Sequence, residues 1–413
     1  MHQLSASKLS SRNRISIEQA QCWRGAQRSG GIAPQLGRRA ASGVAHSIRG
    51  SGFTETTCST LEIVAMKKSV LALAALGAFA GAASAQSSVT LYGRLDTAVT
   101  WTDSTIAEDR FTLNNHQPIG GSRWGLKGSE DLGGGLKANF TLESGFNSDD
   151  GTGNAKLFDR AAWVGLSSAS LGEIRLGRHD TLTRQLNLGY GSDLTAEGEI
   201  TVVDGNFAAG TALAPTGRVL FQNFGTRVDN SVVYLSPSFG GFQVRALVAA
   251  GEGATARQQG LLLGYAAGPI KAGLSYEEYD DAPGGGGSAY NKVFTAGGSY
   301  NFGVATLGLG YQKTSDFGSN AGESVVINDV DAYNVGVLVP FGSFEFRAQY
   351  THSKADLDAG GSNKNDKYGA SLRYALSKRT TIYSAYLHRE SDNDDTFNLT
   401  GKDQFLVGIG HNF

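Results

Sequence analysis

The 413-residue chain has only two cysteines, two methionines and seven prolines, and it has no long apolar run after residue 85. Both cysteines, Cys22 and Cys58, lie before that point, so no disulfide framework supports the rest of the chain. A membrane-spanning helix needs about 20 consecutive apolar residues. These absences exclude a disulfide-stapled domain and a helical membrane protein.

Glycine, in contrast, is abundant. The chain has 57 glycines, about twice the usual share of roughly 7%. Hydrophobic residues make up 40% of the chain. This composition is unlike that of a soluble helical protein.

An export signal is indicated around residue 80. Lys67 and Lys68 follow Met66, and the run from Val70 to Ala83 carries no charge. Small residues then lead to Ala85. The three parts match a secretory signal peptide with cleavage predicted after Ala85. A buried helix of a soluble domain is the alternative reading of this run.

The segment before this signal is rich in Arg and Ser, poor in acids and without hydrophobic periodicity. A mitochondrial transit peptide has a similar composition, but a second, bacterial-type signal would not follow it. We therefore expect residues 1–65 to be a non-native upstream extension from a misassigned start, 66–85 the signal peptide and 86–413 the mature domain. Removing 1–85 takes away ten of 36 basic and three of 38 acidic residues, leaving 26 against 35 and a net charge of −9. This balance argues against nucleic-acid binding.

Apolar and polar residues alternate in segments of about ten residues, which is typical of a barrel crossing an outer membrane with one face toward lipid and one toward a wet lumen. In the first such segment Leu91, Leu95 and Val99 share one face, and Arg94 and Asp96 share the other. A soluble sandwich also alternates, but its loops are of similar length at both ends. The same alternation recurs in residues 136–143, 270–277, 344–351 and 367–374.

The connections between these segments are alternately short and long. Seven short turns and eight long polar or Gly-rich stretches, among them His352–Asp366, predict sixteen strands, the last being Gln404–Phe413. An even number, with short periplasmic turns and long external loops, is what a bacterial barrel requires. The longest stretch, His179–Asn230, is roughly fifty residues without a two-residue period, and a connection of that length is usually functional. The predicted fold class is an all-β, 16-stranded antiparallel transmembrane barrel.

Several stretches resemble one known family. Residues 88–96 read Ser-Val-Thr-Leu-Tyr-Gly-Arg-Leu-Asp, residues 121–133 read Gly-Ser-Arg-Trp-Gly-Leu-Lys-Gly-Ser-Glu-Asp-Leu-Gly, and the chain ends on Gly-His-Asn-Phe. With Leu-Gly-Arg at 176–178 and Asn-Ser-Val-Val-Tyr at 230–234, they resemble the general trimeric porins of Gram-negative bacteria, in particular the betaproteobacterial branch, over essentially all of 66–413. The resemblance implies a third external loop that folds into the barrel, a homotrimer, and a terminal Phe413 that is recognised by the outer-membrane assembly machinery.

Five arginines are candidates for a basic wall at the pore constriction. Alternation turns Arg94 and Arg123 toward the lumen, whereas Arg160 lies in a segment that is apolar on both faces. Strict alternation would turn Arg178 toward lipid, which costs about 2–4 kcal/mol at mid-depth, so we expect a bulge or the strand end to reset the alternation there. Arg227 lies near the return from the longest loop. The resemblance implies a basic cluster at the positions matching Arg94, Arg123 and Arg178; a solvated rim charge is the alternative for each.

The opposing candidates are four acids of the longest loop: Asp193, Glu197, Glu199 and Asp204. Opposite charges held across a narrow wet gap create a transverse field that orients water and dipolar solutes. The Pro-Glu-Phe-Gly-Gly stretch of many enteric porins is absent from this loop. Which acid faces the pore therefore stays open, and ordinary exposed loop carboxylates are the alternative.

No pattern predicts catalysis, a cofactor or a metal. The histidines lack metal-ligand spacing, and no Gly-x-Ser-x-Gly elbow precedes a helix. We predict a general diffusion porin of the bacterial outer membrane that passes small hydrophilic solutes and ions passively. Its expected partners are copies of itself, outer-membrane lipid and lipopolysaccharide, and the assembly machinery, with no nucleic acid. The alternatives are a barrel protease or phospholipase and a plugged adhesive or structural barrel.

Overall fold

The computed structural model describes residues 88–103, 110–114, 121–153, 155–191, 194, 226–252, 257–279, 292–315, 327–358, 360–392 and 403–413. The predicted upstream extension and signal peptide lie outside these residues. In the described part of the chain, no helix is both long enough and apolar enough to cross a membrane.

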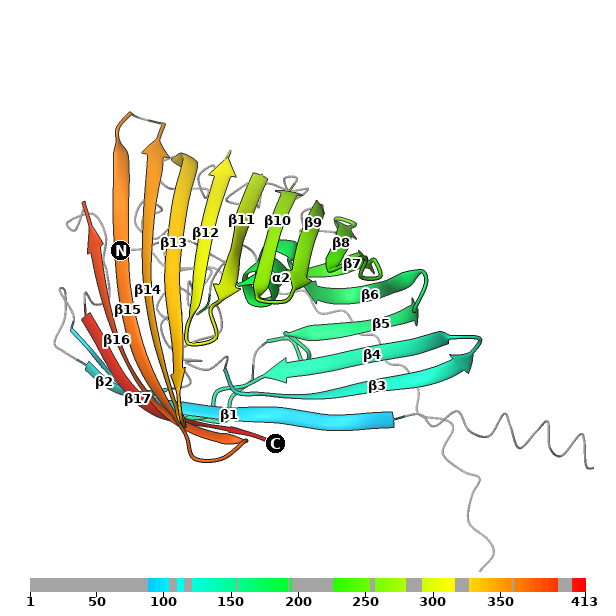
Figure 1. Cartoon of the computed structure of the whole chain (residues 1–413), viewed down its shortest axis with the longest axis horizontal. Helices are drawn as coiled ribbons and strands as arrows, with labels where there is room; N and C mark the ends of the chain where they lie inside the picture. Colours follow the sequence, from blue (N-terminus) through cyan, green and yellow to red (C-terminus); the bar gives the residue numbers. More distant parts are fainter. Residues whose placement is uncertain are drawn as a thin grey trace, which may run out of the picture. The chain divides into compact units, whose positions relative to one another are not determined.

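The strands form one antiparallel sheet that closes on itself (Figure 1). Strand β1 (Ser88–Thr102) pairs along one edge with β17 (Asp403–Asn412). Along its other edge it pairs with β2 (Arg110–Asn114) near its end and with β3 (Arg123–Gly133) near its start. Strands β2 and β3 lie end to end along the same edge of β1, so they occupy one strand position. The seventeen described strands therefore fill sixteen positions around the barrel, which confirms the predicted 16-stranded barrel.

Each remaining strand pairs with its neighbours in sequence, so the barrel is an up-and-down meander. These strands are β4 (Leu136–Gly145), β5 (Ala161–Ser168), β6 (Gly172–Asp180), β7 (Arg227–Leu235), β8 (Phe242–Ala249), β9 (Gln258–Ala267), β10 (Ile270–Tyr279), β11 (Lys292–Asn301), β12 (Thr306–Ser315), β13 (Ile327–Phe341), β14 (Phe344–Leu357), β15 (Ser362–Ala375) and β16 (Thr380–Ser391).

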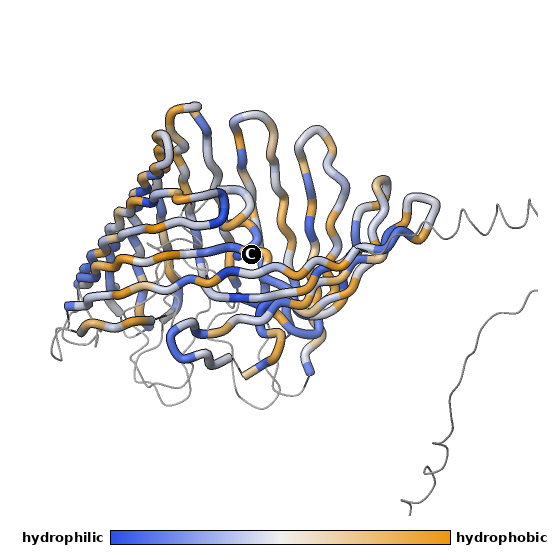
Figure 2. The backbone as a smooth tube through the Cα atoms, turned by 90° about the horizontal axis from the view of Figure 1, so that it is seen from below, coloured by the Kyte–Doolittle hydropathy of each residue, from blue (hydrophilic) through white to orange (hydrophobic). Residues whose placement is uncertain are grey.

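Helix α2 (Leu182–Tyr190) packs against β9, β10 and β11 and identifies the inner face of the barrel. Gly264, Gly273 and Glu277 contact this helix. Directly paired residues share one face of a sheet, so the strand registers extend the inner face around the ring. The outer face carries exposed apolar residues such as Leu91 (60% exposed) and Leu309 (55%). Figure 2 shows hydrophobic and hydrophilic residues alternating along the strands.

Two of the predicted loops illustrate where the structure differs from the sequence analysis. Most of His352–Asp366, predicted as a long loop, is strand, because β14 continues to Leu357 and β15 begins at Ser362. The polar residues there alternate and stay paired across the two strands. Outside the bilayer a strand needs no apolar outer face, so polarity was a poor indicator of a loop. The stretch His179–Asn230 also contains regular structure, namely α2.

The barrel closes on a glycine and the C-terminal aromatic residue. Gly93 N donates to Phe413 O at 3.1 Å, and Phe413 N donates to Gly93 O at 3.0 Å. A Cβ atom on Gly93 would lie 2.2 Å from the Phe413 ring. Because Gly93 has no side chain, the ring of Phe413 can lie across the junction between β1 and β17.

Candidate pore constriction

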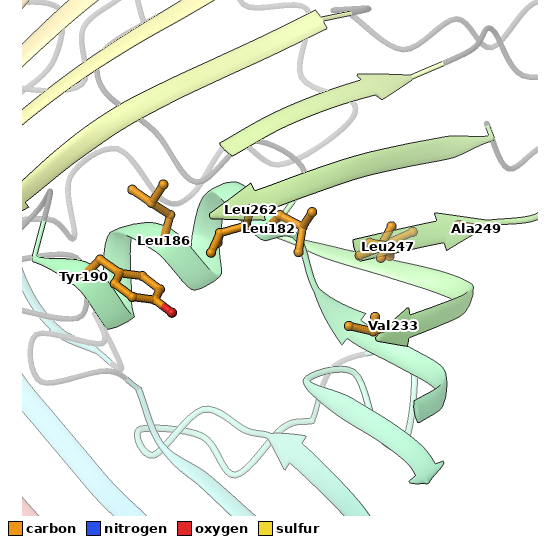
Figure 3. Packing of buried hydrophobic residues seen from close by; sticks show 8 residues of the cluster. Leu182, Leu186, Tyr190, Val233, Leu247, Ala249 and Leu262 are labelled. Carbon is orange, nitrogen blue, oxygen red and sulfur yellow. The ribbon is translucent and has the colours of Figure 1, made fainter. Parts of the chain in front are cut away.

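The connection between β6 and β7, here called loop 3, enters the barrel through α2. Thr181 caps the helix by accepting a hydrogen bond from Arg184 N at 3.3 Å, and Gly191 ends it in the left-handed conformation with φ 74°. Leu182, Leu186 and Tyr190 repeat every fourth residue and share one helix face. They pack on wall residues, as Figure 3 shows: Val233, Leu247, Ala249 and Leu262.

Glycines in the wall make room for loop 3. A Cβ atom on Gly264 would lie 2.0 Å from the Tyr190 side chain, and one on Gly308 would lie 2.7 Å from Leu194 Cγ. Gly336 on β13 also lies beside Leu194. Part of the glycine excess in the sequence is thus explained by a strip of the inner wall, running over β9, β12 and β13, on which loop 3 lies.

Polar wall groups contact loop 3 at two separate points. The carboxylate of Glu277 accepts hydrogen bonds from Leu182 N at 2.9 Å and Thr183 N at 2.7 Å. Further along the loop, Arg347 donates to Leu194 O at 3.1 Å. The described part of loop 3 is therefore attached to β10 near its start and to β14 at Leu194.

Two of the predicted arginines meet at a carboxylate on the inner wall. Glu143 on β4 lies 2.6 Å from Arg160 Nε and 3.9 Å from Arg123 Nε, and it accepts a hydrogen bond from Tyr92 at 2.9 Å. Arg94 is the direct cross-strand partner of Arg123, so the two share the inner face. The structure thus brings Arg94, Arg123 and Arg160 together over β1, β3 and the start of β5.

A second group forms around Arg227. Its Nε donates to the carbonyl oxygen of Arg160 at 3.0 Å and lies 3.3 Å from Asp180 Oδ1. Asp180 also pairs with Arg184 of α2 at 3.2 Å. Arg227 therefore connects the Arg160 segment, the start of loop 3 and α2.

Arg178 lies on β6 beside a register shift between β6 and β7. Between Gly177 and His179 the partners on β7 change from Ser231 to Val228, so the extra residue lies in β7, where Asn230 has φ 53°. Arg178 itself stays in regular register with Ala162 of β5, so the expected bulge in β6 is not seen. Arg178 donates to Asp159 O at 2.7 Å and to Asp229 Oδ1 at 2.5 Å. It therefore fastens the segment before β5 to β7, beside the group around Arg227.

The four predicted loop acids, Asp193, Glu197, Glu199 and Asp204, lie outside the described residues. Among the described residues, the acids that contact the arginines belong to the wall and strand ends. The alternation in residues 136–143 puts Glu143 on the polar face with Lys137 and Thr141, but nothing in a single strand shows which residues of neighbouring strands it meets. Within the described residues, no group of three or more His, Cys, Asp or Glu side chains is placed to hold a metal ion.

Among the described strand residues, basic residues outnumber acids on the inner face. Its basic residues, assigned from the strand registers, are Arg94, Arg123, Lys127, Lys137, Arg175, Arg245, Lys271, Arg347, Lys367, Arg373 and Arg389. Its acids are Asp96, Asp131, Glu143, Glu173, Glu277 and Glu345. The inner wall therefore carries positive charge although the predicted mature chain is acidic.

A closed barrel with an apolar outer face, a charged inner face and a loop folded into its lumen is the architecture of an outer-membrane channel. The family model described as Gram-negative porin matches residues 72–395, and the chain belongs to this family. It is an outer-membrane general diffusion porin, a channel and not an enzyme.

The relatives agree with this assignment. Outer membrane porin protein 32 of Delftia acidovorans is 35% identical over 356 residues, covering 83% of this chain and 95% of the relative. An outer membrane porin protein of Bordetella pertussis is 32% identical over 375 residues, covering 77% of this chain and 93% of the relative. Among solved structures, the anion-selective porin from Comamonas acidovorans is 32% identical, with a TM-score of 0.61 over 79% of this chain and 100% of that chain.

Proposed function

We propose that the pore is narrowest between loop 3 and the arginine-bearing wall of β1 and β3–β7, and that it prefers anions. The observation that carries this proposal is the basic excess on the inner face, together with the grouping of Arg123, Arg160 and Arg227. The similar structure from Comamonas acidovorans is an anion-selective porin. Arg94 and Arg178 flank the group, and the loop acids Asp193, Glu197, Glu199 and Asp204 are the candidates for the opposing side.

Guanidinium groups suit this role because they keep their charge at any physiological pH and present several donors in a fixed plane. A small anion can exchange part of its hydration shell for these donors as it passes. Low-dielectric walls focus the field of such charges into the channel. Passage needs no energy input, since the solute moves down its own gradient.

The reversal potential of single channels under a KCl gradient tests this proposal. Arg123→Gln removes one inner-face charge from a residue whose side chain is 18% exposed, so the potential should shift toward that of a cation-selective channel. The control is Lys354→Gln on the outer face of β14, which should leave the potential unchanged. A cation-preferring wild type, or equal shifts in the two variants, would contradict the proposal.

The porin is, in this proposal, a homotrimer whose copies meet over β1 and β3–β6. The only tyrosine in these strands, Tyr92, faces inward. On β12–β17, by contrast, outward tyrosines donate to acids at 2.5–2.6 Å: Tyr311 to Asp331, Tyr350 to Asp366 and Tyr386 to Asp403. Tyrosine is characteristic of membrane–water interfaces. A face without tyrosine fits contact with another copy better than contact with lipid headgroups.

Three further roles belong to this proposal. Residues 66–85 direct export, Phe413 is the signal that the assembly machinery recognises, and the tyrosine-bearing outer face meets outer-membrane lipid and lipopolysaccharide. Phe413 is 45% exposed at the end of the chain, where a recognition partner can reach it before the barrel closes.

A further inference from the structure

We propose that Glu277 is a positioning residue that holds α2 against the wall and thereby sets the width of the pore. The inference rests on the proposal that loop 3 bounds the constriction. Glu277 lies on β10 and is separated by 94 and 95 positions from the two backbone N–H groups that it accepts from. It is therefore a cap supplied to a helix by a distant strand.

The helix needs this cap. It has only nine residues, and its first turn contains no acidic side chain. Isolated helices of that length are marginal in water, and a carboxylate near the free N–H groups of the first turn is stabilising. Thr181 satisfies one such group, at Arg184 N, while Glu277 accepts from Leu182 N and Thr183 N.

Glu277 in turn needs the helix. Its side chain is 0% exposed, and Gln258 donates a third hydrogen bond to it at 2.8 Å. A buried carboxylate is costly unless hydrogen bonds satisfy it. If α2 left the wall, two of these three bonds would be lost, so the carboxylate and the helix stabilise each other in the docked position.

The wall around Glu277 is shaped for a docked helix. A Cβ atom on Gly260 would lie 3.1 Å from Leu182 Cδ1, and one on Gly273 would lie 3.3 Å from Leu186 Cδ1. Both leucines are fully buried. Apolar burial holds the side of α2 and the carboxylate holds its end, so Glu277 fixes how far along the wall the helix sits.

Replacing Glu277→Gln tests the inference in the full-length protein in planar bilayers. The amide keeps the shape but turns a donor toward a backbone donor. The ratio of docked to released α2 should fall about 10- to 100-fold, which at 1.4 kcal/mol per tenfold is roughly 1.5–3 kcal/mol for losing a charged acceptor. Because a released α2 moves off the wall into the lumen, records should then show a second, lower conductance level that is absent from the wild type, while the unheated protein still migrates as a folded barrel on a gel.

Two variants separate the position of α2 from the loss of a charge. Glu173→Gln removes another inner-face carboxylate, one that contacts Arg175 and Asn139, and it should keep a single conductance level. Adding Leu186→Cys with Gly273→Cys to the Gln variant is designed to form a disulfide, because a Cβ atom on Gly273 would lie 3.4 Å from Leu186 Cγ, the position that the cysteine sulfur would take. Oxidation should remove the lower level, and a reductant should restore it.

A folded Glu277→Gln barrel with one conductance level equal to that of the wild type would overturn the inference, as would a lower level that persists after cross-linking. If this variant does not fold, Glu277→Asp retains the carboxyl group on a shorter side chain and should show the lower conductance level, occupied less often than in the Gln variant. An unchanged record would again overturn the inference. A cation-preferring wild type would defeat the proposed anion preference and leave this result unaffected.

Discussion

At the scale of single residues, the contacts with most consequence join positions far apart in the sequence. Glu143 on β4 pairs with Arg160 at the start of β5. Arg227 donates to the backbone oxygen of Arg160, which is 67 positions earlier in the sequence. Breaking a buried ion pair leaves an uncompensated charge, which is more costly than losing an exposed pair. The arginines of the inner wall therefore also stabilise the association of neighbouring strands with each other and with the start of loop 3.

Gly93 offers a prediction at this scale. A side chain there would meet the Phe413 ring at 2.2 Å and the backbone oxygen of Arg123 at 2.7 Å. We expect Gly93→Val to destabilise the closed barrel by about 1–3 kcal/mol, the usual cost of overpacking, and to reduce the fraction that folds in detergent micelles. The shift between folded and unfolded mobility on a gel measures that fraction.

The matched control for this experiment is Leu95→Val, two positions along the same outer face of β1. The double variant Gly93→Ala with Phe413→Ala removes the clash with the ring but keeps the clash with the Arg123 carbonyl oxygen, which cannot move aside. It should therefore fold better than Gly93→Val but less well than the wild type. Normal folding of Gly93→Val would show that the glycine is not required for closure.

At the scale of elements, α2 and the wall strands form a fitted pair. Gly264 leaves room for Tyr190, which is 5% exposed. Gly264→Val should push Tyr190 and the end of α2 into the lumen and lower single-channel conductance. Adding Tyr190→Ala makes space and should return the conductance toward the wild-type value. Equal conductance in the single and double variants would contradict this account of the wall.

The strands were predictable because their signal is local, whereas α2 was not. Period-two alternation continues along each strand, but the bulge expected at Arg178 in β6 is a bulge in its neighbour β7, which the sequence of β6 does not record. Helix α2 is short, contains Thr183, Asn187 and Gly189, and has no acid in its first turn. Its stability comes from burial against β9 and β10 and from Glu277, which are tertiary contacts that no window of the sequence contains.

The candidate site was predictable to a similar, limited extent. Alternation placed Arg94 and Arg123 on the inner face because each strand records its own parity, and the register confirms that placement. Their partners could not be assigned, since Glu143 reaches Arg160 and Asp180 reaches Arg227 only once the strand registers are known. Which residues form the narrowest point stays a prediction.

At the scale of the whole molecule, charge is sorted by location. The predicted mature chain has a net charge of −9, yet the inner face is predominantly basic. Over distances beyond about 8–10 Å at moderate salt, exposed charges are largely screened. A solute inside the lumen is therefore affected by the nearby wall more than by the net charge of the chain, which is why composition alone did not indicate selectivity.

The last prediction concerns how copies of this molecule meet. Val164 on β5 and Leu309 on β12 are both outward and similarly exposed in one chain, at 57% and 55%, but only Leu309 lies among the outward tyrosines. If β1 and β3–β6 face another copy, a bulky side chain at Val164 must be accommodated in a packed interface, whereas lipid adapts to one at Leu309. We expect Val164→Trp to lower the trimer fraction on unheated gels and in mass photometry, and Leu309→Trp to leave it unchanged, with both barrels folded. A trimer that tolerates tryptophan at Val164 but not at Leu309 would move the interface to the opposite side of the barrel, and a wild type that is monomeric in both measurements would remove the proposed trimer altogether.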